Sequence, residues 1–186
     1  MFEPASYQAT ETLTDGGRVK IRAQRLEDRT ALLEAVDRAS AETLYHRFLA
    51  AKRQISQEEE RTFLDIDFVN HVVLVAETTE GGRPVIIGGC RYVVIEPGKA
   101  EVAFSVIDAY QNKGLGKALI RHLVAIGREA GIEELLADVL FDNVPMLKVF
   151  ERSGLAVTSK RDGSVVHLSM RYAGPLESNR VLATRP

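Results

Sequence analysis

The segment SVIDAYQNKGLGKALI (105–120) is the most informative part of the chain, because it predicts a strand that runs through a glycine turn directly into a helix. At such a junction, successive backbone N–H groups converge on one point, and the helix N-terminus adds about half a positive charge. Gly114 and Gly116 let an anion approach the backbone closely, and Lys113 and Lys117 add positive charge. The segment therefore predicts a phosphate or pyrophosphate site, although the glycines alone fit a plain tight turn equally well.

Two common nucleotide-binding patterns do not fit this segment. A P-loop requires GxxxxGK[ST], and the glycine spacing here differs. The dinucleotide fingerprint GxGxxG would require glycine at position 119, which is Leu119. The anion, if bound, is therefore held in another way.

The hydrophobic pattern on both sides of the segment predicts a mixed α/β (α+β) chain. Alternating or β-branched runs indicate strands, and apolar residues at helical spacing indicate helices. We expect strands at 18–23, 71–77, 85–95, 100–107, 135–141, 156–159 and 165–170, and helices near 26–39, 44–49, 56–64, 115–131 and 144–154.

The composition is that of a single globular domain without a strong charge bias. The 186 residues are 45% hydrophobic and 27% charged, and the net charge of −2 predicts no nucleic-acid partner. No apolar run approaches the roughly 20 residues that span a bilayer, so we expect no membrane partner. One cysteine and four scattered histidines predict no disulfide and no metal site, and we find no signal peptide, so the expected location is the cytoplasm. We expect an N-terminal extension at 1–17, one domain at 18–172 and a C-terminal tail at 173–186.

The glycine segment resembles the Q/R-x-x-G-x-G/A signature of the GNAT acetyltransferase superfamily. A later stretch with Asn143, Phe150 and Gly154 is similar to the family's N-x-x-A…Y-x-x-x-G-F element. The resemblance covers about 85–170. It implies the GNAT fold, with a mixed, mostly antiparallel central sheet of about 6–7 strands and flanking helices, and acetyl-CoA as the cosubstrate of an N-acetyltransferase.

The resemblance also implies which residues hold coenzyme A. Backbone groups at the end of the strand would pair with the pantetheine arm, and the amides of the loop would hold the pyrophosphate. Asn143 would touch the pantetheine or phosphate region, but it fits a helix-capping role equally well. The implied cofactor-binding residues are Val106, Ile107, Gln111, Asn112, Lys113, Gly114, Leu115, Gly116, Lys117, Ala118 and Asn143.

Glu101 is the candidate general base. Transfer to an amine requires a neutral nucleophile, and a carboxylate can remove the proton directly or through water. Strand alternation places Glu101 on one face with the small residues Ala103 and Ser105. The alternative is a solvated glutamate that pairs with Arg91 across a hairpin, but in several GNAT enzymes a glutamate at this strand position is the base.

The family's usual general acid is a tyrosine, and the matching position here is Phe150, which cannot protonate a leaving thiolate. Phe150 and His122 are interpreted as core residues. Cys90 is interpreted as a small buried hydrophobe and not as a nucleophile.

The segments 15–28, 40–48 and 66–76 resemble the bacterial protein lysine acetyltransferases that target acyl-CoA synthetases. The departures are Ala23, where proline is usual, and Phe68, where tyrosine is usual. The resemblance implies a lysine of an acyl-CoA synthetase-like protein as the acceptor, and it allows a homodimer. Two alternatives stay open, namely an acetyltransferase for a small amine or amino acid and a catalytically silent CoA-binding regulator.

Overall fold

The computed structural model describes residues 3–49, 56, 58 and 64–173, and an eight-stranded sheet forms its centre. The strands lie in the order β1-β2-β3-β4-β5-β6-β8-β7. Among the strands of the described residues, β5 and β6 alone pair in parallel, so the expected mixed, mostly antiparallel sheet is confirmed. The strand bounds are β1 Gln8–Thr12, β2 Arg18–Ala23, β3 His71–Glu80, β4 Arg83–Glu96, β5 Lys99–Val106, β6 Glu134–Leu140, β7 Ala156–Asp162 and β8 Val165–Arg171.

The sheet has one strand more than the seven that the sequence pattern indicates. Gln8–Thr12, within the expected N-terminal extension, forms β1 at the sheet edge and pairs with β2. Its residues alternate only between exposed and half-buried positions, so β1 carries no strong apolar signal. A polar edge strand of this kind is difficult to distinguish from a loop by hydrophobicity alone.

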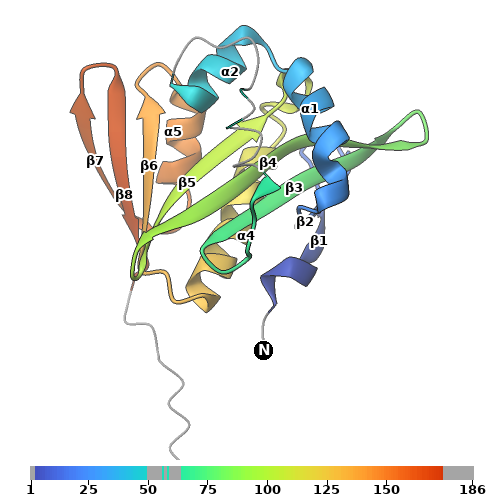
Figure 1. Cartoon of the computed structure of the whole chain (residues 1–186). Coiled ribbons are helices and arrows are strands. Elements are labelled where there is room, and N and C mark those ends of the chain that lie inside the picture. Colours follow the sequence, from blue (N-terminus) through green and yellow to red (C-terminus); the bar gives the residue numbers. More distant parts are fainter. Residues whose placement is uncertain (1–2, 50–55, 57, 59–63, 174–186) are drawn as a thin grey trace, which may run out of the picture.

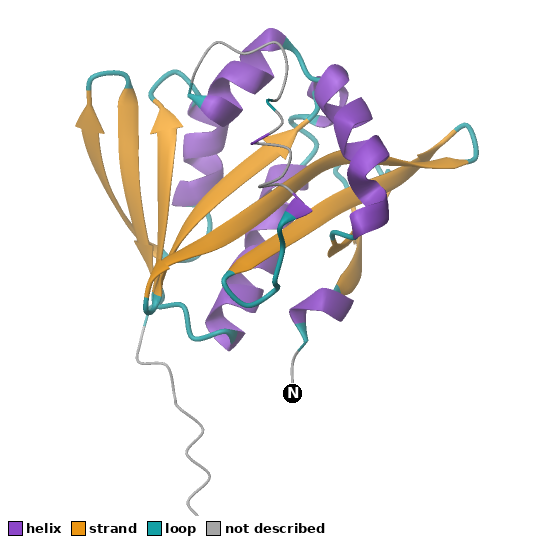
Figure 2. Cartoon of the chain, in the orientation of Figure 1, coloured by secondary structure: helices purple, strands orange, loops and turns teal. Residues whose placement is uncertain are grey.

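Helices cover both faces of the sheet (Figures 1 and 2). Helices α1 (Arg29–Asp37) and α2 (Ala41–Phe48) lie on one face, and α4 (Leu115–Glu129) and α5 (Val144–Glu151) lie on the other. Most of the expected helix near 56–64 falls outside the described residues. Among the described residues, none of the helices combines the length and apolar content that crossing a bilayer requires.

The main core lies between the sheet and α4. Fully buried side chains of β3, β4 and β6 meet an apolar face of α4, and the largest of them include Leu74, Tyr92, Leu119, Leu123 and Leu135. Val102, Phe104 and Val106 of β5 point into this core, as the strand alternation predicts. The residues between them on β5 therefore face α1 and α2.

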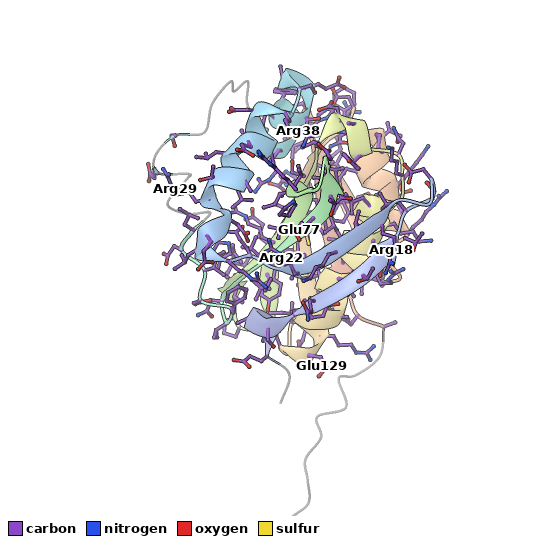
Figure 3. The ribbon with its side chains drawn as sticks, turned by 90° about the vertical axis from the view of Figure 1, so that its right-hand side faces the viewer. Arg18, Arg22, Arg29, Arg38, Glu77 and Glu129 are labelled. Atoms are coloured by element: carbon purple, nitrogen blue, oxygen red, sulfur yellow. The ribbon has the colours of Figure 1, made fainter. Side chains whose placement is uncertain are left out.

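A buried charge network joins β2 and β3 to the start of α1. Arg22 donates two hydrogen bonds to Asp28, at 2.7 and 2.8 Å, and its Nη2 donates to Glu77 at 2.7 Å. Figure 3 shows Arg22 and Glu77 close together on this side of the molecule. Burial raises the pKa of Asp28, but hydrogen bonds from Arg22 and from the Arg25 amide outweigh it and hold that pKa below its usual value. The network thus fixes the base of α1.

Candidate active site

The candidate site is a cleft that opens where β5 and β6 separate. The two strands pair only over Lys99–Glu101 and Glu134–Leu136, and beyond these residues they diverge (Figure 1). The cleft has a volume of about 660 Å³, and α2, β5, the glycine loop, α4, β6 and α5 all contribute to its wall. An extended ligand could therefore lie along the β5 edge that β6 leaves uncovered.

The glycine loop lies at the wide end of this cleft. Gly114, with φ of +85°, is the N-cap of α4, a backbone conformation that favours glycine. The first turn of α4 carries no acidic residue, so its unpaired amides and positive end are available to an anion. The predicted cofactor-binding residues that line the cleft are Val106, Gln111, Asn112, Gly114, Gly116, Lys117 and Asn143.

Four predicted cofactor-binding residues are not among the described residues that line the cleft. Lys113 pairs with Asp15 at 3.0 Å and lies over the Tyr110 ring. The amide of Ile107 donates to the Ile87 carbonyl on β4, and the other two residues, Leu115 and Ala118, are buried in the core. These four residues support the loop through contacts outside the cleft.

Gly116 has a packing role that spacing alone did not indicate. A Cβ at this position would lie 3.3 Å from Cγ2 of Val149 on α5, so the glycine lets the two helices approach closely. Because Gly116 also lines the cleft, the same residue brings α5 close to the predicted phosphate site.

The backbone of β5 can take part in binding along its uncovered edge. Because successive strand residues direct their backbone groups to alternate edges, and Ile107 is bonded to β4, Val106 and Phe104 direct theirs toward the cleft. The Gln111 side chain already donates to the Val106 carbonyl at 3.0 Å. The backbone groups suited to a pantetheine arm therefore lie at Phe104 and at the Val106 amide.

A hydrogen-bond network that the sequence analysis missed fastens α2 to this loop. Asp108 accepts hydrogen bonds from the Ser40 amide at 2.8 Å, the Ser40 hydroxyl at 2.7 Å and the Thr43 hydroxyl at 3.1 Å. Gln111 donates to the same Thr43 oxygen at 2.9 Å. Burial raises the pKa of Asp108, but these hydrogen bonds outweigh it and hold the pKa below its usual value. Two features of the sequence could have indicated this network, namely the aspartate Asp108 between the strand and the glycine loop and the helix-capping serine Ser40.

Glu101 lies at the narrow end of the cleft, at the last residue of β5 that pairs with β6. It is exposed, and strand alternation places it on the α1–α2 face with Ala103 and Ser105, as predicted. The charge of Glu101 also acts on Arg91: burial lowers the pKa of that arginine, and Glu101 partly restores it. Glu101 is therefore both exposed to the cleft and electrostatically coupled to a neighbouring cation.

Phe150 is a core residue, as predicted. Its side chain is 2% exposed, and its ring packs edge-to-face on Phe104 with the centroids 5.4 Å apart. Asn143 accepts a hydrogen bond from the Met146 amide at 3.2 Å and so caps α5. Asn143 also lines the cleft, so its capping role does not exclude contact with a ligand.

His122 and Cys90 lie outside the cleft. His122 is buried and lies between Tyr7 and Glu11, whose carboxylate is 2.7 Å from its Nε2 atom. Burial raises the pKa of the Cys90 thiol well above its usual value, so a thiolate is disfavoured there. Both residues agree with the predicted core roles.

Comparison with known proteins identifies the family. The model of the acetyltransferase (GNAT) family matches residues 33–155, so this chain belongs to the GNAT acetyltransferases. The GNAT domain of PAT from S. lividans superposes with a TM-score of 0.79 at 36% identity, over 88% of this chain and 96% of that domain. A Salmonella typhimurium structure with acetyl-CoA has a TM-score of 0.64 at 20% identity, over 82% of this chain and 91% of that one, and shows the fold alone.

Two curated proteins are similar over about two thirds of this chain. Acetyltransferase PA5475 of Pseudomonas aeruginosa is 34% identical over 126 residues, which are 67% of this chain and 68% of that protein. Acetyltransferase Pat of Mycolicibacterium smegmatis is 36% identical over 129 residues, which are 68% of this chain. The matched part is only 38% of the length of Pat.

Proposed function

We propose that this protein transfers the acetyl group of acetyl-CoA directly to an amine, and that the favoured acceptor is a lysine side chain of an acyl-CoA synthetase-like protein. One observation carries the proposal: Glu101 is exposed at the narrow end of a cleft whose wide end meets the N-terminus of α4. The likeness to acetyltransferase Pat and to the S. lividans PAT domain supports acetyl transfer. The resemblance of segments 15–28, 40–48 and 66–76 to the bacterial protein lysine acetyltransferases supports a protein acceptor.

The binding half of the reaction uses the uncovered edge of β5 and the start of α4. The pyrophosphate of CoA would lie at the amides of Gly114 and Gly116, with Lys117 adding positive charge. The pantetheine arm would pair with β5 as an added strand does, which directs the thioester toward Glu101.

The chemical half is a single displacement. The amine nitrogen attacks the thioester carbon, an amide bond forms, the C–S bond breaks, and CoA leaves as a thiolate. Glu101 accepts the amine proton, directly or through one water molecule. Because Phe150 offers no proton, water or another group protonates the thiolate, or the thiolate leaves unassisted.

Two other functions would use the same cleft. A small amine or amino acid could take the place of the lysine. A CoA-binding regulator without activity is the other alternative, and the absence of a hydroxyl at Phe150 favours it. The exposed carboxylate of Glu101 argues against a silent binder.

The test is to incubate the protein and its Glu101→Gln variant with radiolabelled acetyl-CoA and a purified acyl-CoA synthetase, and to separate the products on a gel. We expect label on the synthetase with the wild-type protein and little with the variant. Label on free polyamines or amino acids, but on no protein, would contradict the lysine acceptor. Tight acetyl-CoA binding with no labelled product of any kind would favour the regulator.

A further inference from the structure

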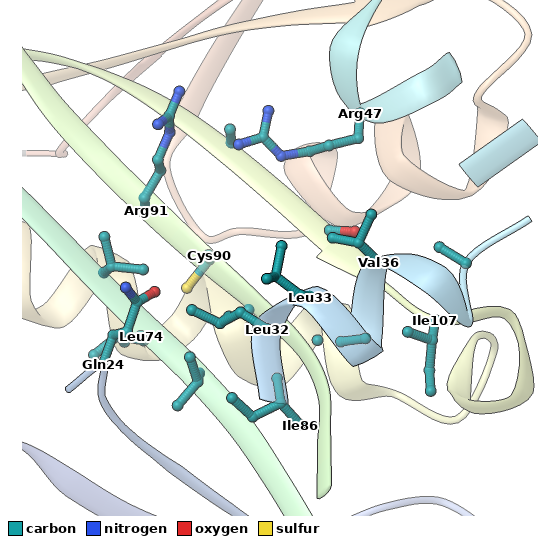
Figure 4. A pocket seen from close by; sticks show the side chains of 18 of the residues that line it. Gln24, Leu32, Leu33, Val36, Arg47, Leu74, Ile86, Cys90, Arg91 and Ile107 are labelled. Carbon is teal, nitrogen blue, oxygen red and sulfur yellow. The ribbon is translucent and has the colours of Figure 1, made fainter. Parts of the chain in front are cut away.

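A second cavity lies between α1 and the sheet, next to the cleft (Figure 4). It has a volume of about 120 Å³. Its wall on the helix side includes Leu32, Leu33 and Val36 of α1 together with residues of α2, and its sheet side includes Val75 and Ile86. The cavity is therefore apolar over most of its surface.

Small residues on the sheet leave space for the cavity between the sheet and α1. Gly88 and Gly89 of β4 line it, and a Cβ at either position would lie only 2.7 or 2.6 Å from a carbonyl oxygen of a neighbouring strand. The close pairing of β3, β4 and β5 thus requires glycine at both positions. On β5, Ala103 and Ser105 continue the row of small residues.

The cavity and the cleft share Ala103 and Ser105 as part of their walls. Both residues follow Glu101 on the same strand and point to the same face of the sheet. Arg47 and Phe48 of α2 also line both spaces, so a group attached to a thioester beside Glu101 would enter the cavity between these two side chains and the small residues of β5.

The charged residues of the cavity wall bear on which group could enter it. Arg47 and Arg91 both line the cavity, and in Figure 4 the guanidinium of Arg47 points toward Arg91. Two guanidinium groups disfavour an incoming ammonium. The β6 side of the cleft carries Asp138 and Asp142, which lie beside His167 and His46, and it also carries Lys148 and Arg152. The charge of the cavity wall therefore favours an uncharged group over a cationic amine under α1.

We propose that the cavity under α1 receives the acyl chain of a donor longer than acetyl, so that the protein binds short aliphatic acyl-CoA thioesters of about three to six carbons. This inference rests on the proposed function, because it assigns the thioester to the neighbourhood of Glu101. A methylene group fills about the volume of one water molecule, roughly 30 Å³, so the cavity has room for about four further carbons.

The test is to measure the dissociation constants of CoA, acetyl-CoA, butyryl-CoA and octanoyl-CoA by calorimetry, without an acceptor. Each buried methylene strengthens binding roughly fourfold, so butyryl-CoA, with two more methylenes, should bind about 15-fold more tightly than acetyl-CoA. The acyl chain of octanoyl-CoA is too long for the cavity, so octanoyl-CoA should not show this increase in affinity over acetyl-CoA.

The Val36→Phe variant should fill the cavity, remove the gain for butyryl-CoA and leave acetyl-CoA binding within about twofold. Val69→Phe is the matched control, because Val69 is exposed and does not line the cavity, and it should keep the wild-type ratio. Leu33→Ala should enlarge the cavity and move the optimum to a longer chain, so the assignment is testable even if Val36→Phe fails to fold.

The outcomes separate the two proposals. Equal affinity for acetyl-CoA and butyryl-CoA in the wild-type protein, or a gain that persists in a folded Val36→Phe variant, would overturn the cavity assignment alone. Failure of CoA and of all its thioesters to bind would instead contradict the proposed function.

Discussion

Glu101 illustrates how a single strand residue can combine exposure with precise placement. Its neighbours Val102 and Phe104 are buried against α4 and α5, so the backbone of β5 cannot rotate to remove Glu101 from the cleft. Its place at the end of the β5–β6 pairing fixes the distance between this carboxylate and the glycine loop. A reacting group on a sheet is held more rigidly than one on a loop.

Replacement of Glu101 by glutamine keeps the size of the side chain but removes the proposed base. We expect the turnover number to fall by about 10²- to 10⁴-fold, while the dissociation constant of acetyl-CoA stays within about twofold. Steady-state kinetics and calorimetry measure the two quantities. Glu96→Gln is the matched control, since Glu96 lies on the same hairpin but pairs with Lys99 near the turn. An unchanged turnover in Glu101→Gln would remove this residue from the mechanism.

Arg22 is a residue whose loss should strongly reduce stability. Its side chain is 6% exposed and neutralises both Asp28 and Glu77, so Arg22→Met would leave a buried carboxylate without its cation. We expect the free energy of unfolding to fall by about 3–5 kcal/mol in urea denaturation.

Arg38→Met provides the comparison for Arg22. Arg38 pairs with Glu80 at 2.9 Å, but both side chains are more than one third exposed, so the cost should be about 0–1 kcal/mol. Similar losses in both variants would contradict the view that burial decides the strength of the Arg22 network.

At the scale of elements, the cleft depends on how α2, α4 and α5 meet at the wide end of the β5–β6 gap. Asp108 fixes the start of α2 to the loop before α4, and Gly116 lets α4 and α5 pack closely. The sequence predicted the strand, loop and helix around Gly114, because each has a local pattern. It did not predict the contact between Ser40 and Asp108, since residues so far apart in the chain leave no periodic signal.

A substitution of Asn143 can separate its role as the cap of α5 from its proposed role in CoA binding. Asn143→Asp keeps an oxygen that can accept from the Met146 amide, so the thermal midpoint should change little. It also replaces the amide donor by a negative charge in the cleft, which should weaken CoA binding by about tenfold if this side chain faces the phosphates. Unaltered CoA affinity in a stable Asn143→Asp protein would leave Asn143 with the capping role alone.

At the scale of the whole molecule, several carboxylates stabilise the fold only while they are ionised. Burial raises the pKa of Asp67, but hydrogen bonds from the amides of His71, Val69 and Asn70 outweigh it and lower the pKa from 3.8 to about 2. Asp28 and Asp108 also have lowered pKa values. A lowered folded-state pKa gives stability that is fully present above the unfolded value and is lost as the pH falls.

The urea midpoint should therefore be nearly constant just above pH 5 and decrease between about pH 4 and pH 2. Circular dichroism at a series of pH values measures it. Asp67→Asn should be less stable than the wild-type protein at pH 7 and should lose less stability through the acid window. A decrease of equal size in both proteins would exclude Asp67 as a source of the acid sensitivity.

The sequence by itself determined the family, the strand–loop–helix at 105–120 and the faces of β5, because local spacing fixes backbone geometry and side-chain direction. Only the tertiary structure decided which loop residues face the cleft, since Lys113 is held by Asp15 and Ile107 by β4. The polar strand β1 and the cavity under α1 also depend on long-range packing. Contacts between segments distant in the chain are set by how the helices and strands pack, and that packing leaves no repeat in the sequence.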